Sequence, residues 1–461
     1  MYRNAMKELI AWKDNPRRKP LIVNGARQVG KTWLVCAFGA EHFDKVAHIV
    51  FLENEEMQRA FEGSLDPNRL LMLISAATGT NPHDGKTLVF FDEIQECPRA
   101  LTSLKFFCEQ CPHIPVIAAG SLLGVALNRG KNMRTQGTSW PVGKVDYLDL
   151  YPLTFDEFVR ARENDALADL VFHGEADMID AFSERLTDLL KTYFFVGGMP
   201  EVVQEYLDTG DFSAARAVQQ RLLIDYEHDF AKHVESALEI ERIRQTWHSV
   251  PLQLAREADI KRFSYASIKQ GGRGRDYRDA ISWLVDAGLV SKVERVSKPG
   301  LPLAGYADDV YFKLYLLDIG LLGAATGLDA ATIVKGSSMF TEYKGAYAEQ
   351  YVCQQLRAAG AKPYYWSADG KQTKGEVDFI IERNAELLPI EVKAEENITG
   401  GSLAAFVKRY DLKRAVRFCL RGFKEQDWLV NIPLYAVNAF CKRLEMSKVQ
   451  YRVIREKIAE A

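Results

Sequence analysis

The sequence predicts an α/β fold that is divided into more than one domain. Short apolar runs at residues 20–24, 47–52 and 87–92 suit buried parallel strands, and helical segments stand between them. Residues 25–32 read GARQVGKT and connect the first of these strands to a helix. The chain has 461 residues, which is more than a single hydrophobic core accommodates, so we expect two to four domains.

The glycine-rich segment at residues 25–32 has the pattern G-x-x-x-x-G-K-T in the context that this pattern requires, between a strand and a helix. Backbone N–H groups in such a loop, together with the helix N-terminus, bind phosphate groups. We expect Lys31 to reach the β- and γ-phosphates of ATP and the Thr32 hydroxyl to ligate Mg²⁺. The residues predicted to bind the nucleotide in this segment are Gly25, Ala26, Arg27, Gln28, Val29, Gly30, Lys31, Thr32 and Trp33.

Two acidic residues follow the apolar run at residues 87–91. We expect Asp92 to hold Mg²⁺ through water and Glu93 to act as the general base that polarises the attacking water. A further strand at residues 114–121 carries Ser121 to its C-terminal end, where ligands of open α/β sheets bind. Ser121 is therefore a candidate γ-phosphate sensor, and a helix N-cap is an equally good interpretation. Together these features predict Mg²⁺-dependent hydrolysis of ATP.

A cationic side chain that stabilises the transition state is also expected. Arg129 and Arg134 are the nearest candidates in the sequence, and Lys144 is a weaker one. If such a residue acted on the nucleotide of a neighbouring chain, the protein would be a homo-oligomer.

Four longer segments read FFDEIQECPRALTSLKFFCEQ, VIAAGSLLGVAL, SWPVGKVDYLDLYPLTFDEF and GGMPEVV. In these segments the chain resembles a prokaryotic AAA-type ATPase family, and the similarity runs through essentially the whole sequence. The resemblance implies an AAA-type P-loop ATPase domain and a C-terminal domain of unknown function with a restriction-endonuclease-like α/β fold. It also matches the segment at residues 312–321 to the junction between domains, where Asp318 is interpreted as a helix cap. We expect an ATPase domain at 1–155, a helical lid over the nucleotide at 156–235, a winged-helix-like module at 236–305 and the endonuclease-like domain at 306–461.

The winged-helix-like module is predicted from a helix that starts at residue 243, a short helix at 264–269, a further helix around Tyr277 and a strand from Leu289. Three arginines stand near the start of the last helix, where groove contacts are usually made: Arg273, Arg275 and Arg278. Three aspartates dilute the positive charge of this segment: Asp276, Asp279 and Asp286. We therefore expect a protein–protein or intramolecular role for the module ahead of DNA binding.

An ordered set of acidic residues and a lysine marks the C-terminal part. Glu349 stands on an amphipathic helix, Asp378 on a strand at 375–381, and Glu391 and Lys393 two apart on the next strand. The carboxylates Glu349, Asp378 and Glu391 could coordinate Mg²⁺, while Lys393 orients or deprotonates a water that attacks a phosphodiester. This set resembles the nuclease pattern PD-(D/E)-x-K. A surface hairpin with salt bridges would show the same residues, and folds of this class also serve as binding domains without catalysis.

Three aromatic residues precede this set: Tyr364, Tyr365 and Trp366. They could stack on bases, although packing in a core or a place on the surface of a hairpin is the more frequent fate of such a cluster.

The composition is that of an ordinary globular protein. The net charge of −3 argues against a strongly basic nucleic-acid binder but allows a local basic patch. Seven scattered cysteines fit a reducing compartment, and Cys108 and Cys111 are interpreted as partly buried thiols rather than zinc ligands. The charged N-terminus lacks the apolar core of a signal peptide, and the near-apolar stretch at 115–127 is too short to span a bilayer. We therefore expect a cytoplasmic protein without membrane contact.

These features support two functions. The first is an ATP-hydrolysing switch whose nucleotide state controls a nuclease-like domain acting on DNA or another nucleic acid. The second is a nucleotide-gated binding or regulatory protein, with a nucleic-acid or protein partner and a catalytically inactive nuclease-like domain. A small-molecule kinase is a third use of the same loop, but Glu93, placed to act on water, and the long C-terminal part argue against it.

Overall fold

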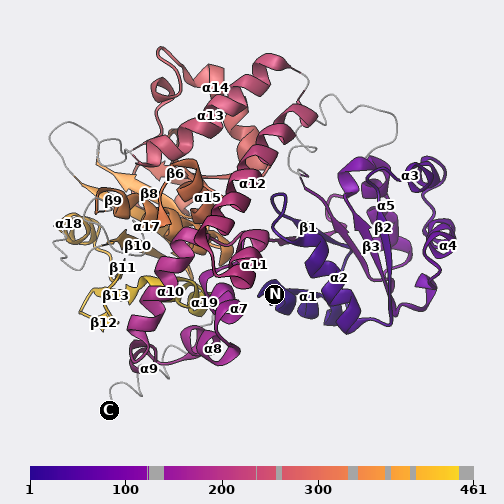
Figure 1. Cartoon of the computed structure of the whole chain (residues 1–461), viewed down its shortest axis with the longest axis horizontal. Helices are drawn as coiled ribbons and strands as arrows, with labels where there is room; N and C mark the ends of the chain where they lie inside the picture. Colours follow the sequence, from indigo (N-terminus) through magenta and orange to yellow (C-terminus); the bar gives the residue numbers. More distant parts are fainter. Residues whose placement is uncertain are drawn as a thin grey trace. The chain divides into compact units, whose positions relative to one another are not determined.

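The computed structural model describes residues 1–121, 123, 140–234, 236–255, 262–330, 341–368, 375–394 and 401–445. The chain divides into two compact units, Met1–Tyr151 with Trp283–Leu289, and Pro152–Ser282 with Val290–Ala461. Figure 1 shows the elements of both units along the sequence. The domain borders expected near residues 155, 235 and 305, and the position of the lid over the nucleotide, stay predictions.

The first unit is built on a parallel sheet of five strands in the order β2-β3-β4-β1-β5. Its strands are β1 (Leu21–Asn24), β2 (Lys45–Val50), β3 (Thr87–Asp92), β4 (Val116–Ala119) and β5 (Asp146–Asp149). Its helices are α1 (Ala5–Asp14), α2 (Lys31–His42), α3 (Glu55–Glu62), α4 (Pro67–Thr78), α5 (Pro98–Gln110) and the short 3-10 turns η1 (Pro82–Asp84) and η2 (Ile94–Glu96). The predicted α/β fold and its parallel strands are thereby confirmed.

Both faces of this sheet are covered, which explains why its central strands β1, β3 and β4 are almost continuous apolar runs. On one face, Ile49, Phe91 and Ala118 pack with apolar side chains of α3, α4 and α5. On the other face, α2 approaches so closely that a Cβ atom on Gly39 would lie 2.4 Å from the Val46 side chain. The sheet is therefore a rigid frame that holds the loops at its carboxyl edge.

The second unit contains an eight-stranded mixed sheet in the order β12-β13-β11-β10-β9-β8-β6-β7. Its strands are β6 (Val290–Val296), β7 (Ala307–Leu316), β8 (Tyr364–Ser367), β9 (Glu376–Arg383), β10 (Glu386–Val392), β11 (Ala415–Cys419), β12 (Lys424–Glu425) and β13 (Leu429–Pro433). β10, β11 and β13 are parallel neighbours, whereas β8 with β9, β9 with β10, and β12 with β13 pair in antiparallel fashion.

Helices make up the rest of the second unit. They are α7 (Phe155–Arg162), α8 (Asp165–His173), α9 (Ala176–Asp180), α10 (Ser183–Val196), α11 (Pro200–Thr209), α12 (Phe212–His233), α13 (Ala237–Ala255), α15 (Ile319–Ala325), α17 (Thr341–Ala358), α18 (Gly401–Arg409), α19 (Val437–Glu445) and the 3-10 turns η4 (Tyr265–Ser267), η5 (Leu303–Tyr306) and η7 (Leu434–Ala436). Helix α14 (Gly274–Asp286) crosses the border between the two units.

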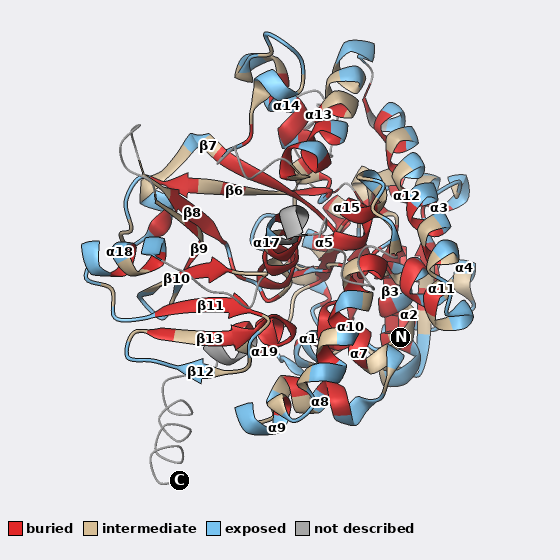
Figure 2. Cartoon of the chain, turned by 60° about the vertical axis from the view of Figure 1, so that its left-hand side comes forward, coloured by how far each residue is buried: buried red, intermediate tan, exposed pale blue. Residues whose placement is uncertain are grey.

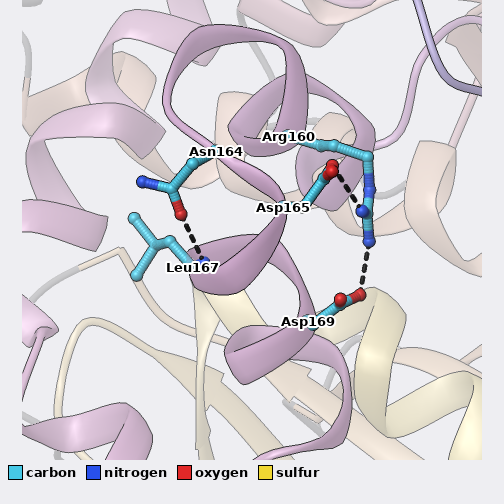
Figure 3. Close-up of polar contacts among 5 residues, drawn as sticks. All are labelled: Arg160, Asn164, Asp165, Leu167 and Asp169. Carbon is cyan, nitrogen blue, oxygen red and sulfur yellow. Dashed lines mark hydrogen bonds and ion pairs between the residues drawn. The ribbon is translucent and has the colours of Figure 1, made fainter.

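Local side-chain contacts define the turn between α7 and α8. Asn164 caps α8 by accepting a hydrogen bond from the Leu167 backbone N–H at 2.8 Å, and Arg160 pairs with both Asp165 and Asp169 (Figure 3). An asparagine at the N-cap and a cation that bridges two acids one turn apart are local signals that start a new helix here.

The predicted cap at Asp318 is confirmed. Its carboxylate accepts hydrogen bonds from the backbone N–H groups of Gly320 and Leu321 at the start of α15. The same carboxylate accepts from the Gly198 N–H and from the side-chain amide of Gln354 on α17. Asp318 is fully buried, and it connects three segments of the second unit as well as capping the start of α15.

The elements expected for the winged-helix-like module occur in order, as α13, η4, α14 and β6. A 3-10 turn replaces the short helix expected at 264–269, and β6 forms an antiparallel pair with β7. Arg273, Arg275 and Arg278 are exposed. The identification of these elements as a winged helix stays a prediction.

The three aromatic residues of β8 pack in the core. Tyr364, Tyr365 and Trp366 are buried, and the Trp366 ring contacts those of Phe406 and Tyr410. The suggestion that they stack on bases is therefore wrong, because burial leaves no room for a base beside their rings.

The thiols of Cys108 and Cys111 are free and at least partly buried, as expected, and burial raises the pKa of both. In the described part of the chain, no helix combines the length and apolar character needed to cross a bilayer.

Candidate functional sites

The phosphate-binding loop follows β1 at the carboxyl edge of the first sheet. The loop needs glycine at its two ends, because Gly25 and Gly30 have φ angles of +147° and +93°. A Cβ atom on Gly25 would also lie 2.3 Å from the Leu150 carbonyl oxygen. Gly30 caps α2, so the loop leads directly into a helix N-terminus with Lys31 as its first residue.

Lys31 lies almost entirely beneath the loop, with 8% of its surface exposed. Its ammonium donates hydrogen bonds to the carbonyl oxygens of Gly25 and Ala26, at 2.9 and 2.7 Å. Burial lowers the pKa of Lys31 to about 8, and the charges of Glu93 and Asp92 oppose part of that change. The neighbouring Thr32 and Trp33 are exposed at the start of α2.

Asp92 and Glu93 follow β3 at the same edge of the sheet. The Asp92 carboxylate is buried, lies 3.3 Å from His48 Nε2 on β2, and accepts a hydrogen bond from the Glu93 N–H. Glu93 has a φ of +49°, a left-handed conformation that is costly for a side-chain-bearing residue and concentrates at functional sites.

Two polar side chains contact the Glu93 carboxylate, and a third contacts one of these two. Gln95 donates a hydrogen bond to Glu93 Oε2, and the Ser121 hydroxyl lies 3.4 Å from the same oxygen. Arg27, from the phosphate-binding loop, donates to the Ser121 hydroxyl at 3.1 Å. Residues that follow β1, β3 and β4 thus meet at one point. Whether Ser121 senses a γ-phosphate stays a prediction.

A second group of charged side chains lies in the C-terminal sheet. Lys313 on β7 has 2% of its side chain exposed and lies 3.1 Å from Glu349 on α17 and 3.0 Å from Glu376 on β9. Asp378 is partly buried nearby and accepts the Val392 N–H at 2.7 Å. Burial, followed by the Glu349 charge, raises the pKa of Asp378 well above its usual range, while Lys313 acts in the opposite direction.

Glu391 and Lys393 form a separate pair of contacts. Glu391 Oε1 lies 3.6 Å from Lys393 Nζ, and Glu391 Oε2 accepts a hydrogen bond from Arg417 Nε at 2.8 Å. Within the described residues, no three His, Cys, Asp or Glu side chains are grouped so that they could hold a metal ion. Glu349 on α17 and the strand residues Asp378 and Glu391 therefore each contact another group of the protein: Lys313, the Val392 N–H and Arg417, respectively.

Family comparisons agree with the geometry of the first unit. Residues 17–159 match the model described as an AAA domain, and residues 187–332 and 344–437 match two domains of unknown function, DUF8612 and DUF4143. No curated protein matches the sequence. The N-terminal part of the chain is an AAA-type ATPase domain.

Solved structures similar to this chain have low sequence identity. A Walker-type ATPase of Pyrococcus abyssi is 16% identical, over 70% of this chain and 94% of its own, with a TM-score of 0.42. The Orc1 protein of Aeropyrum pernix in complex with DNA is 12% identical, over 71% and 93%, with a TM-score of 0.26. DnaA of Aquifex aeolicus bound to AMPPCP is 13% identical, over 61% and 85%, with a TM-score of 0.23.

The candidates for a transition-state cation in the AAA-type domain are not equivalent. Lys144 pairs with Glu109 at 3.0 Å and precedes the amino end of β5, whereas the phosphate-binding loop follows the carboxyl end of the parallel strand β1. Lys144 is therefore wrong as a candidate for its own chain's nucleotide. Arg129 and Arg134 lie outside the described residues.

Sequence reasoning missed Arg3, which supports the loop of the AAA-type domain from below. Its guanidinium is buried and donates hydrogen bonds to the carbonyl oxygens of Val29 and Tyr151. Arg3 thus links the phosphate-binding loop to the segment after β5. Sequence reasoning also missed Lys313 and Arg417, whose carboxylate partners lie on other strands or helices. An isolated Arg or Lys carries no local signal of such a role.

Proposed function

We propose that this protein binds and hydrolyses ATP with Mg²⁺ and that its nucleotide state controls a C-terminal unit that binds or acts on nucleic acid. The observation that carries the proposal is the convergence of Lys31, Glu93 and Ser121 at one edge of the AAA-type sheet. There, the charges of the buried Asp92 and the partly buried Glu93 interact with that of Lys31. A buried lysine beside two acids at a helix N-terminus suits a phosphate chain and its metal.

The residues near the loop also fit a magnesium ion. Thr32 supplies a hydroxyl from the first turn of α2, and Asp92 supplies a carboxylate from the end of β3. These are the hard oxygen donors that Mg²⁺ prefers when it is bound together with phosphates. When bound, the ion would neutralise charge on the phosphates. Lys31 would hold the β- and γ-phosphates, Arg27 and Ser121 would fix the position of Glu93, and Glu93 would accept the proton of the attacking water.

The test is steady-state ATP hydrolysis by the purified chain and two variants. Lys31→Ala should lose both binding and hydrolysis, while Glu93→Gln should retain ATP binding and lose at least about a hundredfold in kcat, because only the base is removed. Glu96→Gln, which removes a nearby acid in η2, serves as the matched control and should hydrolyse like the parent. If Lys31→Ala and Glu93→Gln both hydrolyse ATP at the parent rate, the site is assigned wrongly.

A second candidate function is a nucleotide-gated binding protein whose C-terminal unit does not cleave. The observation that favours it is that two of the three predicted metal ligands, Glu349 and Glu391, already have cationic partners. Lys313 neutralises Glu349, and Arg417 and Lys393 neutralise Glu391. A lysine or arginine that occupies a carboxylate competes with a divalent cation for it.

Plasmid and single-strand cleavage with Mg²⁺ or Mn²⁺ separates the two functions. Metal-dependent cleavage that disappears in both Asp378→Ala and Lys393→Ala would reject the non-cleaving protein. A salt-sensitive complex without cleavage would support it.

A further inference from the structure

One row of polar side chains crosses four strands of the C-terminal sheet. The strand register pairs Glu391 with Arg417, Arg417 with Asn431, and Asn431 with Lys424. Register partners on adjacent strands project from the same face of a sheet, so these four side chains form a continuous line. The row runs from the Glu-x-Lys motif to β12, whose two residues are exposed. Figure 2 shows β12 beside β13 at the edge of the sheet.

A cavity of about 510 Å³ lies along the outer half of this row. This volume is in the range of pockets that hold a single small molecule, such as one nucleotide. Its lining combines cationic, aromatic and amide side chains, namely Arg417, Arg421, Phe423, Lys424, Trp428 and Asn431. Arg421 and Lys424 are exposed at the rim, whereas Arg417 has 8% of its surface exposed and lies at the base.

Asn431 supplies an independent indication of a ligand. It is 5% exposed, and its Oδ1 atom accepts no hydrogen bond from any described residue. A buried acceptor without a donor costs about 1–3 kcal/mol, and a bound water or a ligand can supply the missing donor. An exocyclic amino group of cytosine or adenine is a donor of the right kind, since asparagine commonly pairs with base edges.

The acidic groups near the cavity do not cancel its charge. None of its lining residues is acidic, and Glu425, next to Lys424 on β12, projects from the opposite face of the sheet. Asp180 approaches from α9, where its carboxylate accepts the Phe423 N–H and the Tyr435 hydroxyl, both at 3.3 Å. The Asp180 carboxylate is therefore engaged in contacts that fix the turn before β12. The positive charges of Arg421 and Lys424 at the rim can then bind an anion.

We infer that this cavity binds one nucleotide of a single-stranded nucleic acid. Arg421 and Lys424 contact the phosphate, the ring of Trp428 stacks on the base, and Asn431 Oδ1 accepts a hydrogen bond from the base amino group. A single strand fits because a base inside a duplex cannot expose its face to an aromatic ring. The inference rests on the proposed nucleic-acid role of the C-terminal unit, and it identifies the residues that would bind the strand.

The test is fluorescence anisotropy of a labelled single-stranded DNA of about a dozen nucleotides with the full chain. EDTA is present and ATP is absent, so neither hydrolysis nor cleavage contributes. The double variant Arg421→Glu with Lys424→Glu should bind at least about tenfold more weakly and show a shallower dependence of affinity on salt. The double variant Lys408→Glu with Lys413→Glu makes the same charge change at two exposed lysines outside the cavity and should bind like the parent.

Trp428 tests the stacking contact. Trp428→Ala should lower affinity about tenfold, and Trp428→Phe should restore most of it, because a smaller aromatic ring still stacks. Unchanged affinity in the rim double variant, or an equal loss in the control, would overturn the assignment of the cavity. Competition by free cytidine monophosphate as effective as that by unlabelled strand would overturn the assignment to a strand. Failure of the parent to bind any strand would overturn both this inference and the nucleic-acid part of the proposed function, whereas ATP hydrolysis is measured separately.

Discussion

At the scale of single residues, burial decides the chemistry of the phosphate site. The Lys31 ammonium is enclosed by its own loop, and the loss of hydration lowers its pKa to about 8. Its identity as the phosphate-binding lysine follows from the sequence, because the motif is contiguous. The change in the pKa of Lys31 does not follow from the sequence. It depends on the burial of the side chain and on the nearby charges of Glu93 and Asp92, which the folded sheet brings together.

The lowered pKa of Lys31 predicts that ATP binding takes up protons near pH 8. In the free protein about half of the Lys31 side chains carry a proton at pH 8, whereas bound phosphates favour the charged ammonium. When ATP is supplied as its Mg²⁺ complex, whose terminal phosphate is already deprotonated, Lys31 should therefore contribute an uptake of about half a proton at pH 8 and almost none at pH 6.5. Isothermal titration calorimetry in buffers with different ionisation enthalpies measures this number. Equal proton uptake at the two pH values would contradict the prediction.

At the scale of elements, a few buried polar residues decide how helices meet. Gln350 on α17 exchanges two hydrogen bonds with the backbone of Leu316 on β7, and Gln355 accepts the Phe155 N–H at the start of α7. The amphipathic pattern of α17 predicts a helix with a buried face. The pattern does not indicate that glutamines on this face form hydrogen bonds with backbone groups of β7 and α7. An isolated glutamine in a sequence is more often a surface residue.

Asp318 makes the stability of the second unit depend on pH. Burial raises its pKa from 3.8 to about 6, so the folded state binds this proton more tightly than the unfolded state does. Stability from this group is therefore greatest below about pH 4 and falls as the pH rises towards 6. Between pH 4.5 and 7, the parent should lose about 2 kcal/mol relative to Asp318→Asn, which cannot ionise. The measurement is the difference in Tm between the two proteins across this range.

Asp211→Asn is the control for this comparison. Asp211 caps α12 by accepting the Ser213 N–H at 2.7 Å, but it is exposed. It reports the effect of losing an aspartate cap at the surface. If the Tm difference between Asp318→Asn and the parent follows the same course with pH as that of Asp211→Asn, burial of Asp318 is not the cause.

At the scale of the whole molecule, the proposed coupling between nucleotide and nucleic acid can be measured as a linkage. Glu93→Gln should bind ATP without hydrolysing it, so its affinity for the labelled strand can be compared with and without ATP. A coupling of typical size would change that affinity by about five- to a hundredfold. The strand must then change the affinity for ATP by the same factor. Lys31→Ala should show no effect of ATP on the strand, and equal strand affinity in Glu93→Gln with and without ATP would show that the two units act independently.

The sequence by itself determined the parts of this protein that are contiguous in the chain. The strand, loop and helix around Lys31, the acids that end β3, and the cap at Asp318 are each specified within a few residues, so local pattern predicts them. Strand register and helix packing decided the contacts between residues that are far apart in the chain. They bring Arg3 beneath the loop, set Lys313 against Glu349, and align Arg417 with Asn431, because contacts between residues far apart in the chain depend on which segments the core brings together.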